Sequence, residues 1–474
     1  MNRPSKTSFV CQQCGKESPK WLGRCPDCQG WSTFVETRVA ISKSARTTSA
    51  SIEHPACELF QITTEEMPRL SSAFGEFDRV LGGGIVPGSL VLISGDPGIG
   101  KSTLLLQVSD GIARQGKKVI YASGEESLYQ TRLRADRLGI KGEGLYLLNE
   151  TNLEVILRQM EEMSPGLGVI DSIQTVYLRE LDGAPGSVSQ IRECTLRLMQ
   201  WAKLSTIPLL ITGHVTKEGA IAGPKVLEHI VDVVTYLEGE TFSTYRLLRG
   251  IKNRFGSTNE VGIFEMTADG LAEVQNPSQV FLSQRSQRAA GSVVAPVLEG
   301  TRPLLVEIQA LTTQTSFGLP RRTANGIDLN RLQLIIAVLT KRVGLRLSNQ
   351  DIIVNVVGGL KVNEPAVDLA VALAVASSFS DREIDPNLIA VGEIGLSGEV
   401  RAVAQLERRL AEAARQGFTH CVGPKASLSS LKLPGGMEVL SVNSLREALR
   451  VTLRKPRQEK DAEGVASGEA GNSD

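Results

Sequence analysis

The segment at 90–103 restricts the possible folds of this chain more than any other feature. It reads Leu-Val-Leu-Ile-Ser-Gly-Asp-Pro-Gly-Ile-Gly-Lys-Ser-Thr, an apolar run, then the loop pattern G-x-x-x-x-G-K-S, then the apolar start of a helix. In such a loop backbone amides surround phosphate groups, the lysine reaches the β- and γ-phosphates, and the serine hydroxyl binds magnesium. We therefore predict an ATP and Mg²⁺ site, with Lys101 catalytic and Ser102 a magnesium ligand. The expected nucleotide contacts are Gly95, Asp96, Pro97, Gly98, Ile99, Gly100, Lys101, Ser102 and Thr103.

Acidic residues follow two further apolar runs. Asp171 ends the run Leu-Gly-Val-Ile-Asp, where a carboxylate can orient magnesium through water, although an acid at this place can also cap a helix. Glu125 and Glu126 follow Val-Ile-Tyr-Ala-Ser-Gly. One of them could polarise the attacking water, and the other could begin the next helix. We predict catalytic roles for all three, with Asp171 also at the magnesium ion.

Apolar and helical patterns alternate along two stretches of the chain, which predicts an α/β protein. From about 60 to 275 the alternation favours a mostly parallel sheet covered by helices. Its expected strands are 90–94, 118–122, 168–171 and 208–212. The second stretch, from about 293 to 450, has expected strands at 304–309 and 352–357 and expected helices at 330–342, 366–378 and 402–416.

Four of the seven cysteines crowd into the first 28 residues. Cys11-Gln-Gln-Cys14 and Cys25-Pro-Asp-Cys28 are two C-x-x-C turns, each followed closely by a glycine. Four thiolates from two such turns make a closed tetrahedral site, so we predict a structural Zn²⁺ at Cys11, Cys14, Cys25 and Cys28. The remaining cysteines, Cys57, Cys194 and Cys421, are expected to be inert packing residues.

Length and charge exclude several classes. At 474 residues the chain is too long for one core, and its 52 basic and 52 acidic residues leave no net charge that would draw it to nucleic acid or membrane. The N-terminus has no apolar signal segment, and the longest apolar run, 369–376, is too short to span a membrane. We therefore expect a cytoplasmic protein with no membrane contact.

Several motifs resemble one known family. The stretch Leu-Gly-Gly-Gly-Ile-Val-Pro-Gly at 81–88, together with Gly-Glu-Glu-Ser at 124–127, resembles the RecA-type core of recombinases, the clock ATPase KaiC and the replicative helicase DnaB. The sequence Lys-Asn-Arg-Phe-Gly at 252–256 matches the signature of the RadA (Sms) family of bacterial DNA repair proteins. This resemblance implies that Lys252 and Arg254 are catalytic, reaching the γ-phosphate held by a neighbouring subunit. It also implies that His214 senses the γ-phosphate and that 217–225 is a DNA-facing loop. The ordinary alternatives are a solvated basic turn and a structural histidine.

The family's domain order covers nearly the whole chain. It implies a zinc ribbon at 8–34, a flexible linker at 35–59, a RecA-like ATPase domain at 60–275, a Lon-protease-like domain at 285–452 and a disordered tail at 455–474. The segment 355–368 resembles the catalytic loop of Lon proteases, in which a serine follows the proline. Here that position is Ala366, and alignment puts Glu407 at the position of the catalytic lysine. Since a methyl group cannot attack a carbonyl, we predict no peptidase activity.

The resemblance implies a DNA-dependent ATPase, helicase-like, that forms a homohexameric ring and promotes branch migration in recombinational DNA repair. Its implied partners are single-stranded and branched DNA and a RecA-type recombinase. Basic residues of the Lon-like domain that could face DNA phosphates are Arg321, Arg322, Arg331, Lys341, Arg342 and Arg346. The alternative is a KaiC-like assembly or signalling ATPase that does not move along DNA.

Overall fold

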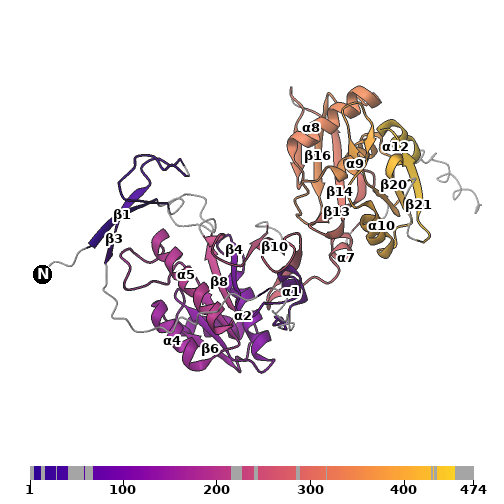
Figure 1. Cartoon of the computed structure of the whole chain (residues 1–474). Coiled ribbons are helices and arrows are strands. Elements are labelled where there is room, and N and C mark those ends of the chain that lie inside the picture. Colours follow the sequence, from indigo (N-terminus) through magenta and orange to yellow (C-terminus); the bar gives the residue numbers. More distant parts are fainter. Residues whose placement is uncertain are drawn as a thin grey trace, which may run out of the picture. The chain divides into compact units, whose positions relative to one another are not determined.

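The computed structural model divides the chain into two compact units, 1–275 and 276–474 (Figure 1). It describes residues 5–11, 16–27, 29–40, 58, 68–214, 227–239, 244–283, 285, 289–316, 318–428, 431 and 435–453. Most of the expected linker, the expected DNA-facing loop and the expected tail lie outside these residues. None of the described helices is both long and apolar enough to cross a membrane.

The N-terminal segment forms a small antiparallel sheet. Its strands are β1 (Ser5–Cys11), β2 (Glu17–Ser18) and β3 (Phe34–Ala40), in the order β2-β1-β3. Cys11 is the register partner of Phe34, and β3 runs antiparallel to the whole of β1. The structure therefore extends the ribbon to Ala40, whereas the sequence placed 35–40 in the linker. The difference arises because β-pairing with β1 is a long-range contact that composition does not reveal.

The first unit is built on a nine-stranded sheet in the order β12-β11-β10-β9-β4-β8-β7-β5-β6. The six strands from β9 to β6 are parallel, and β10, β11 and β12 continue the sheet antiparallel. The parallel strands are β4 (Leu90–Gly95), β5 (Val119–Ser123), β6 (Leu145–Leu148), β7 (Leu167–Asp171), β8 (Leu209–His214) and β9 (Val233–Glu238). The antiparallel strands are β10 (Tyr245–Asn253), β11 (Val261–Thr267) and β12 (Gly270–Glu273). All four strands expected in this part of the sequence are present.

Helices cover both faces of this sheet, as buried parallel strands require. One face carries α1 (Gly75–Leu81), α2 (Lys101–Ala113) and α3 (Leu128–Arg137), and the other carries α4 (Leu153–Met163) and α5 (Val188–Ser205). The helices begin where their sequences favour it. Ser127 and Gln130 form a reciprocal capping box at the start of α3, and Asn152 caps α4. Every residue of β4, β5 and β7 is buried, so these strands hold their C-terminal ends in fixed positions.

The second unit is a seven-stranded mixed sheet with helices. The strand order is β15-β16-β14-β13-β17-β20-β21. These strands are β13 (Ser292–Glu299), β14 (Arg302–Gln314), β15 (Arg322–Asn325), β16 (Gln350–Val356), β17 (Leu388–Ala390), β20 (His420–Pro424) and β21 (Glu438–Val442). A short separate hairpin joins β18 (Glu393–Ile394) to β19 (Val400–Arg401). The helices are α7 (Pro277–Leu282), α8 (Leu329–Val338), α9 (Asp368–Ser380), α10 (Leu406–Arg415), α11 (Lys425–Leu428) and α12 (Leu445–Thr452), with a π-helical turn η2 (Leu339–Val343) and a 3₁₀ turn η3 (Pro365–Val367).

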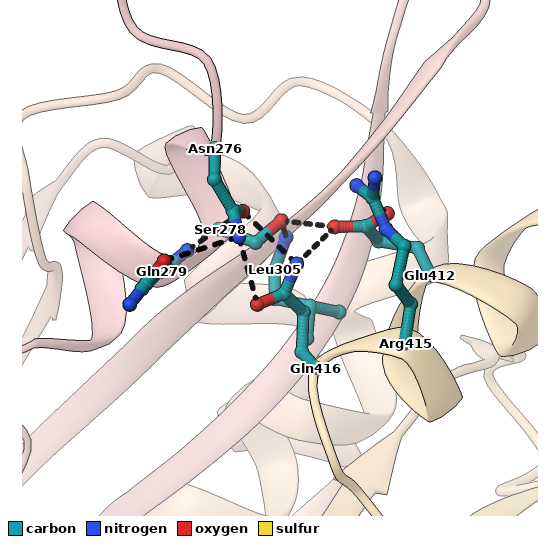
Figure 2. A network of polar contacts seen from close by, with 7 residues as sticks. All are labelled: Asn276, Ser278, Gln279, Leu305, Glu412, Arg415 and Gln416. Atoms are coloured by element: carbon teal, nitrogen blue, oxygen red, sulfur yellow. Dashed lines mark hydrogen bonds and ion pairs between the residues drawn. The ribbon is translucent and has the colours of Figure 1, made fainter.

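Helix α7 belongs to the second unit, which therefore starts at Asn276, earlier than the expected boundary at 285. Figure 2 shows the polar contacts that hold it. The Ser278 hydroxyl donates to the buried Glu412 carboxylate of α10 at 2.6 Å and accepts from the backbone amide of Leu305 on β14 at 3.1 Å. Gln416 donates to Glu412 and to Asn276 at 3.0 and 2.9 Å. These contacts fix the first helix of the unit to its sheet.

Candidate active site

The phosphate loop joins the end of β4 to the start of α2. Gly95, Gly98 and Gly100 all have positive φ, and a Cβ on Gly100 would lie 2.8 Å from the methyl carbon of Met266 on β11. Only glycine suits such a position, because the backbone conformation and the lack of space both exclude a side chain. The backbone amides at the start of α2 are thereby left accessible to an anion.

Lys101 lies at the centre of this loop and is almost fully buried. Its ammonium donates to the carbonyls of Gly95 and Asp96, at 2.9 Å each. Burial lowers the pKa of Lys101 below its ordinary value, and the nearby carboxylates of Asp171 and Glu125 oppose that shift. The positive charge of Lys101 is therefore stabilised by carboxylates of the same site.

A cavity of about 270 Å³ opens in front of the loop. It collects side chains from the loop, from the end of β5, from α3 and from the end of β7. The residues that line it are Gly98, Gly100, Lys101, Ser102, Thr103, Glu125, Glu126, Arg134, Arg137 and Asp171. The structure thus brings together the loop residues and all three carboxylates that the sequence singled out, because the C-terminal ends of β4, β5 and β7 share one edge of the sheet.

The two adjacent glutamates have different surroundings. Glu125 accepts a hydrogen bond from the hydroxyl of Ser172, the residue after Asp171, and its charge acts on Lys101. Glu126 instead forms an ion pair with Arg134 on α3, and its backbone carbonyl accepts from the Asn149 amide at 3.0 Å. Glu125 therefore faces the loop and β7, whereas Glu126 is paired with an arginine in the last turn of α3.

Asp171 is buried at the end of β7 and accepts two hydrogen bonds from hydroxyls. Tyr121 on β5 donates to one carboxylate oxygen, and Thr212 on β8 donates to the other, each at 2.6 Å. Burial and the neighbouring Asp171 raise the pKa of Tyr121 well above its ordinary value, so its hydroxyl stays protonated. No sequence pattern indicated these two donors, which lie 50 and 41 residues away from Asp171 along the chain.

Lys252 and Arg254 lie at the opposite edge of the sheet. The Lys252 ammonium donates to the carbonyls of Glu228 and Val231 at 2.5 and 2.8 Å, and burial lowers its pKa. The Arg254 guanidinium lies 3.2 Å from the carboxylate of Asp232, which also accepts from the backbone amide of Leu90 at the first residue of β4. The phosphate loop begins at the last residue of β4, so the structure does not bring these two cations to the loop of their own chain.

His214 is the last residue of β8, and its backbone lies opposite Gly95 of β4. This places the residue next to the start of the phosphate loop. The loop expected at 217–225 falls outside the described residues.

Two of the four predicted zinc ligands are described, and they lie together. Cys11 and Cys25 are both buried in one small cluster with Phe34. The Cys11 sulfur donates to the Thr33 hydroxyl at 3.1 Å. Cys14 and Cys28 lie outside the described residues, as does Cys57. Among the cysteines of the two α/β units, Cys194 and Cys421 are buried, and burial raises the pKa of each thiol to about 12, as expected of inert packing residues.

The loop before α9 carries Ala366, and the structure corrects the position expected for Glu407 relative to it. Ala366 is buried in η3 and belongs to an apolar cluster that includes Leu406 and Leu410 of α10. We expected Glu407 to occupy the partner position, but Glu407 is exposed to solvent on α10. The helical period turns Leu406, Arg409 and Leu410 toward the core of the unit and Glu407 toward solvent.

The basic residue that α10 does aim at this loop is Arg409, which is 1% exposed. Its guanidinium makes two hydrogen bonds to the Glu364 carboxylate, at 2.8 and 2.5 Å, and a third to the carbonyl of Pro296 at 2.7 Å. An ion pair between a buried guanidinium and a partly exposed carboxylate therefore joins α10 to the loop that carries Ala366. Sequence alignment alone missed Arg409, which lies two residues beyond Glu407.

Three of the six basic residues proposed for DNA contact are used within the second unit. Arg331 forms a bidentate ion pair with the fully buried Asp368, and Arg322 and Arg342 donate to backbone carbonyls. Lys341 and Arg346 are exposed, and neither has a partner among the described residues. These two remain the cations most available to an anionic ligand.

The fold and the site together define a P-loop ATPase with a RecA-like core, an N-terminal zinc ribbon and a C-terminal Lon-like α/β domain. Three family models agree with this class: a rubredoxin metal binding domain matches 9–36, an AAA domain matches 58–220, and the ChlI subunit of Mg-chelatase matches 310–427.

The chain belongs to the RadA family of DNA repair proteins. It is 54% identical over 458 residues to DNA repair protein RadA of Bacillus subtilis, an alignment that covers 95% of this chain and 99% of the relative. It is 53% identical to DNA repair protein RadA of Listeria monocytogenes and 52% identical to that of Streptococcus pyogenes, over 94% of this chain and 98% of each relative.

Proposed function

We propose that this protein hydrolyses ATP at the cavity beside the phosphate loop. The observation that carries the proposal is the convergence of Lys101, Glu125 and Asp171 on one cavity. In this proposal Lys101 holds the β- and γ-phosphates, Ser102 and Asp171 hold and orient Mg²⁺, and the bound ion neutralises charge that develops on the phosphates. Glu125 polarises the attacking water, because Glu126 is already paired with Arg134.

The nucleotide base would extend into a second hollow next to the first. This hollow, about 290 Å³, shares Thr103 and Arg137 with the phosphate cavity and is also lined by Leu138, Met266 and the β11–β12 turn. Apolar walls beside a polar phosphate site suit a purine and ribose better than phosphate alone. The pair of hollows supports a nucleoside triphosphate as the ligand.

Zinc would hold the N-terminal ribbon together. The support is that Cys11 and Cys25 are buried in one cluster, so both could belong to one four-thiolate site. Cys14 and Cys28 would complete it. With four protein ligands the ion has no open position, so its role would be structural.

We further propose that ATP turnover drives a homohexameric ring along single-stranded and branched DNA during recombinational repair, together with a RecA-type recombinase. Two observations support this finer reading. The relatives that align along almost their whole length carry the name DNA repair protein. Arg254, whose side chain is half exposed, lies on the edge away from its own loop, where it would be able to reach a neighbour's nucleotide, and Lys252 would have to give up its two backbone carbonyls to join it. The Lon-like domain, with Ala366 in place of a nucleophile, would serve as scaffold and DNA track, not as a peptidase.

ATP hydrolysis measured with and without single-stranded DNA tests this function. Stimulation by DNA, lost in Lys101→Ala, is the expected result. Turnover that DNA does not change would favour a KaiC-like timing or assembly ATPase. Absence of any turnover in the natural sequence, in the presence of Mg²⁺ and DNA, would refute the assignment of the cavity.

A further inference from the structure

Asp171 is held from both sides by hydroxyl groups of the neighbouring strands. Strand β7 lies between β5 and β8, and Tyr121 and Thr212 come from those two strands. Each hydroxyl donates to a different oxygen of the Asp171 carboxylate, at 2.6 Å. The carboxylate is thus fixed by one contact on each oxygen and cannot rotate without losing one of them.

All three side chains are buried, so their polar atoms need hydrogen-bond partners within the protein. Tyr121 is 2% exposed, Thr212 is 0% exposed and Asp171 is 8% exposed. A buried hydroxyl needs a partner, and either side chain could have used a backbone carbonyl, as Thr235 on β9 does by donating to Leu92 at 3.3 Å. Both instead donate to Asp171, one of the three carboxylates that line the phosphate cavity.

An ionised carboxylate can accept about four hydrogen bonds, so two of its lone-pair positions are taken and two remain. The small exposed fraction of Asp171 is the part that lines the cavity with Lys101 and Ser102. Groups that hold a metal-orienting carboxylate typically matter about 10- to 100-fold for metal affinity or activity.

We propose that Tyr121 and Thr212 are positioning residues that orient Asp171 toward the Mg²⁺ of bound ATP. The inference rests on the proposed function of the cavity, since it assumes that Asp171 orients the ion. It assigns a role to two residues that touch neither nucleotide nor metal. The alternative is that the hydroxyls merely find a buried hydrogen-bond acceptor in Asp171 and stabilise the sheet.

The test is the binding of a non-hydrolysable ATP analogue, the β,γ-imido compound, by calorimetric titration in Mg²⁺ and in EDTA. The measured quantity is the gain in affinity that Mg²⁺ gives. We expect Tyr121→Phe and Thr212→Val each to reduce this gain about 10-fold, while affinity in EDTA stays within about twofold of the natural protein. Thr212→Ser, which keeps the hydroxyl, should restore the gain. Thr235→Val, a buried strand threonine outside the site, is the matched control and should keep it.

The outcomes distinguish a failure of the positioning role from a failure of the metal site. Variants that fold with lower melting temperatures yet keep the full Mg²⁺ gain would overturn the positioning role and leave the cavity's function intact. A natural protein that gains no affinity from Mg²⁺ would overturn the metal site itself, and the positioning role with it. If Tyr121→Phe does not fold, the Thr212→Val and Thr212→Ser pair decides.

Discussion

Mixing two inactive variants, Lys101→Ala and Arg254→Ala, should restore part of the ATPase activity. The expectation comes from where Arg254 lies. Its guanidinium contacts Asp232 beside Leu90, at the start of β4, whereas the phosphate loop begins at Gly95, at the end of that strand. Five steps of about 3.3 Å separate the two ends by roughly 17 Å. That exceeds the reach of an arginine side chain, so Arg254 can act on a γ-phosphate only in a neighbouring chain.

The size of the recovery follows from counting interfaces in a closed ring. Each variant alone should lose about 10³-fold or more in turnover, because one lacks the phosphate lysine and the other lacks the arginine that stabilises transition-state charge. In equal, random mixtures, about one interface in four joins an intact Lys101 to an intact Arg254. If interfaces act independently, activity should return to about a quarter of the natural value.

The assay is steady-state ATP hydrolysis with single-stranded DNA across a series of mixing ratios, after exchange of subunits is confirmed by mass. The Arg254 side chain is half exposed, and the buried Asp232 carboxylate still accepts from the Leu90 amide and lies 3.9 Å from Lys203 without it, so Arg254→Ala should fold. Lys203→Ala is the control, because Lys203 also approaches Asp232, at 3.9 Å, on the same edge. It should be active alone. Mixed rings that recover nothing would refute action between subunits and leave Lys252 and Arg254 as structural or DNA-binding residues.

Four further predictions follow from the sites. Lys101→Ala should abolish ATP hydrolysis. Near-normal turnover in this variant would refute the assignment of 95–103 as the phosphate-binding loop. Cys28→Ala should lose the roughly one zinc per chain expected of a four-thiolate site, measured by metal analysis; full zinc would contradict the ligand set. Ala366→Ser should give no casein cleavage, because α10 presents leucines and no lysine to that position. Arg409→Met should lower the unfolding free energy of the second unit by about 1–3 kcal/mol, because it removes two hydrogen bonds from the partly exposed Glu364 carboxylate and one from the Pro296 carbonyl. Hydrogen exchange of α9 peptides would measure this loss, and a change below 1 kcal/mol would contradict it.

Features carried by neighbouring residues could be predicted from the sequence. The phosphate loop is one continuous segment whose glycines, lysine and serine have fixed roles, so its strand and its helix followed from local pattern. The same holds for the two C-x-x-C turns and for the absence of a nucleophile at Ala366. Strands β4, β5, β7 and β8 could likewise be predicted, because buried parallel strands have apolar sequences.

The tertiary structure alone decided how these segments share their polar groups. Glu125 and Glu126 are adjacent in sequence, and only the packing of α3 assigns Arg134 to Glu126 and leaves Glu125 beside Ser172. Alignment placed Glu407 opposite Ala366, but the rotation of α10 turns that residue to solvent and buries Arg409 against Glu364 instead. Hydrogen-bond partners depend on strand order and helix rotation, which are set by contacts between distant parts of the chain, and a local pattern does not encode them.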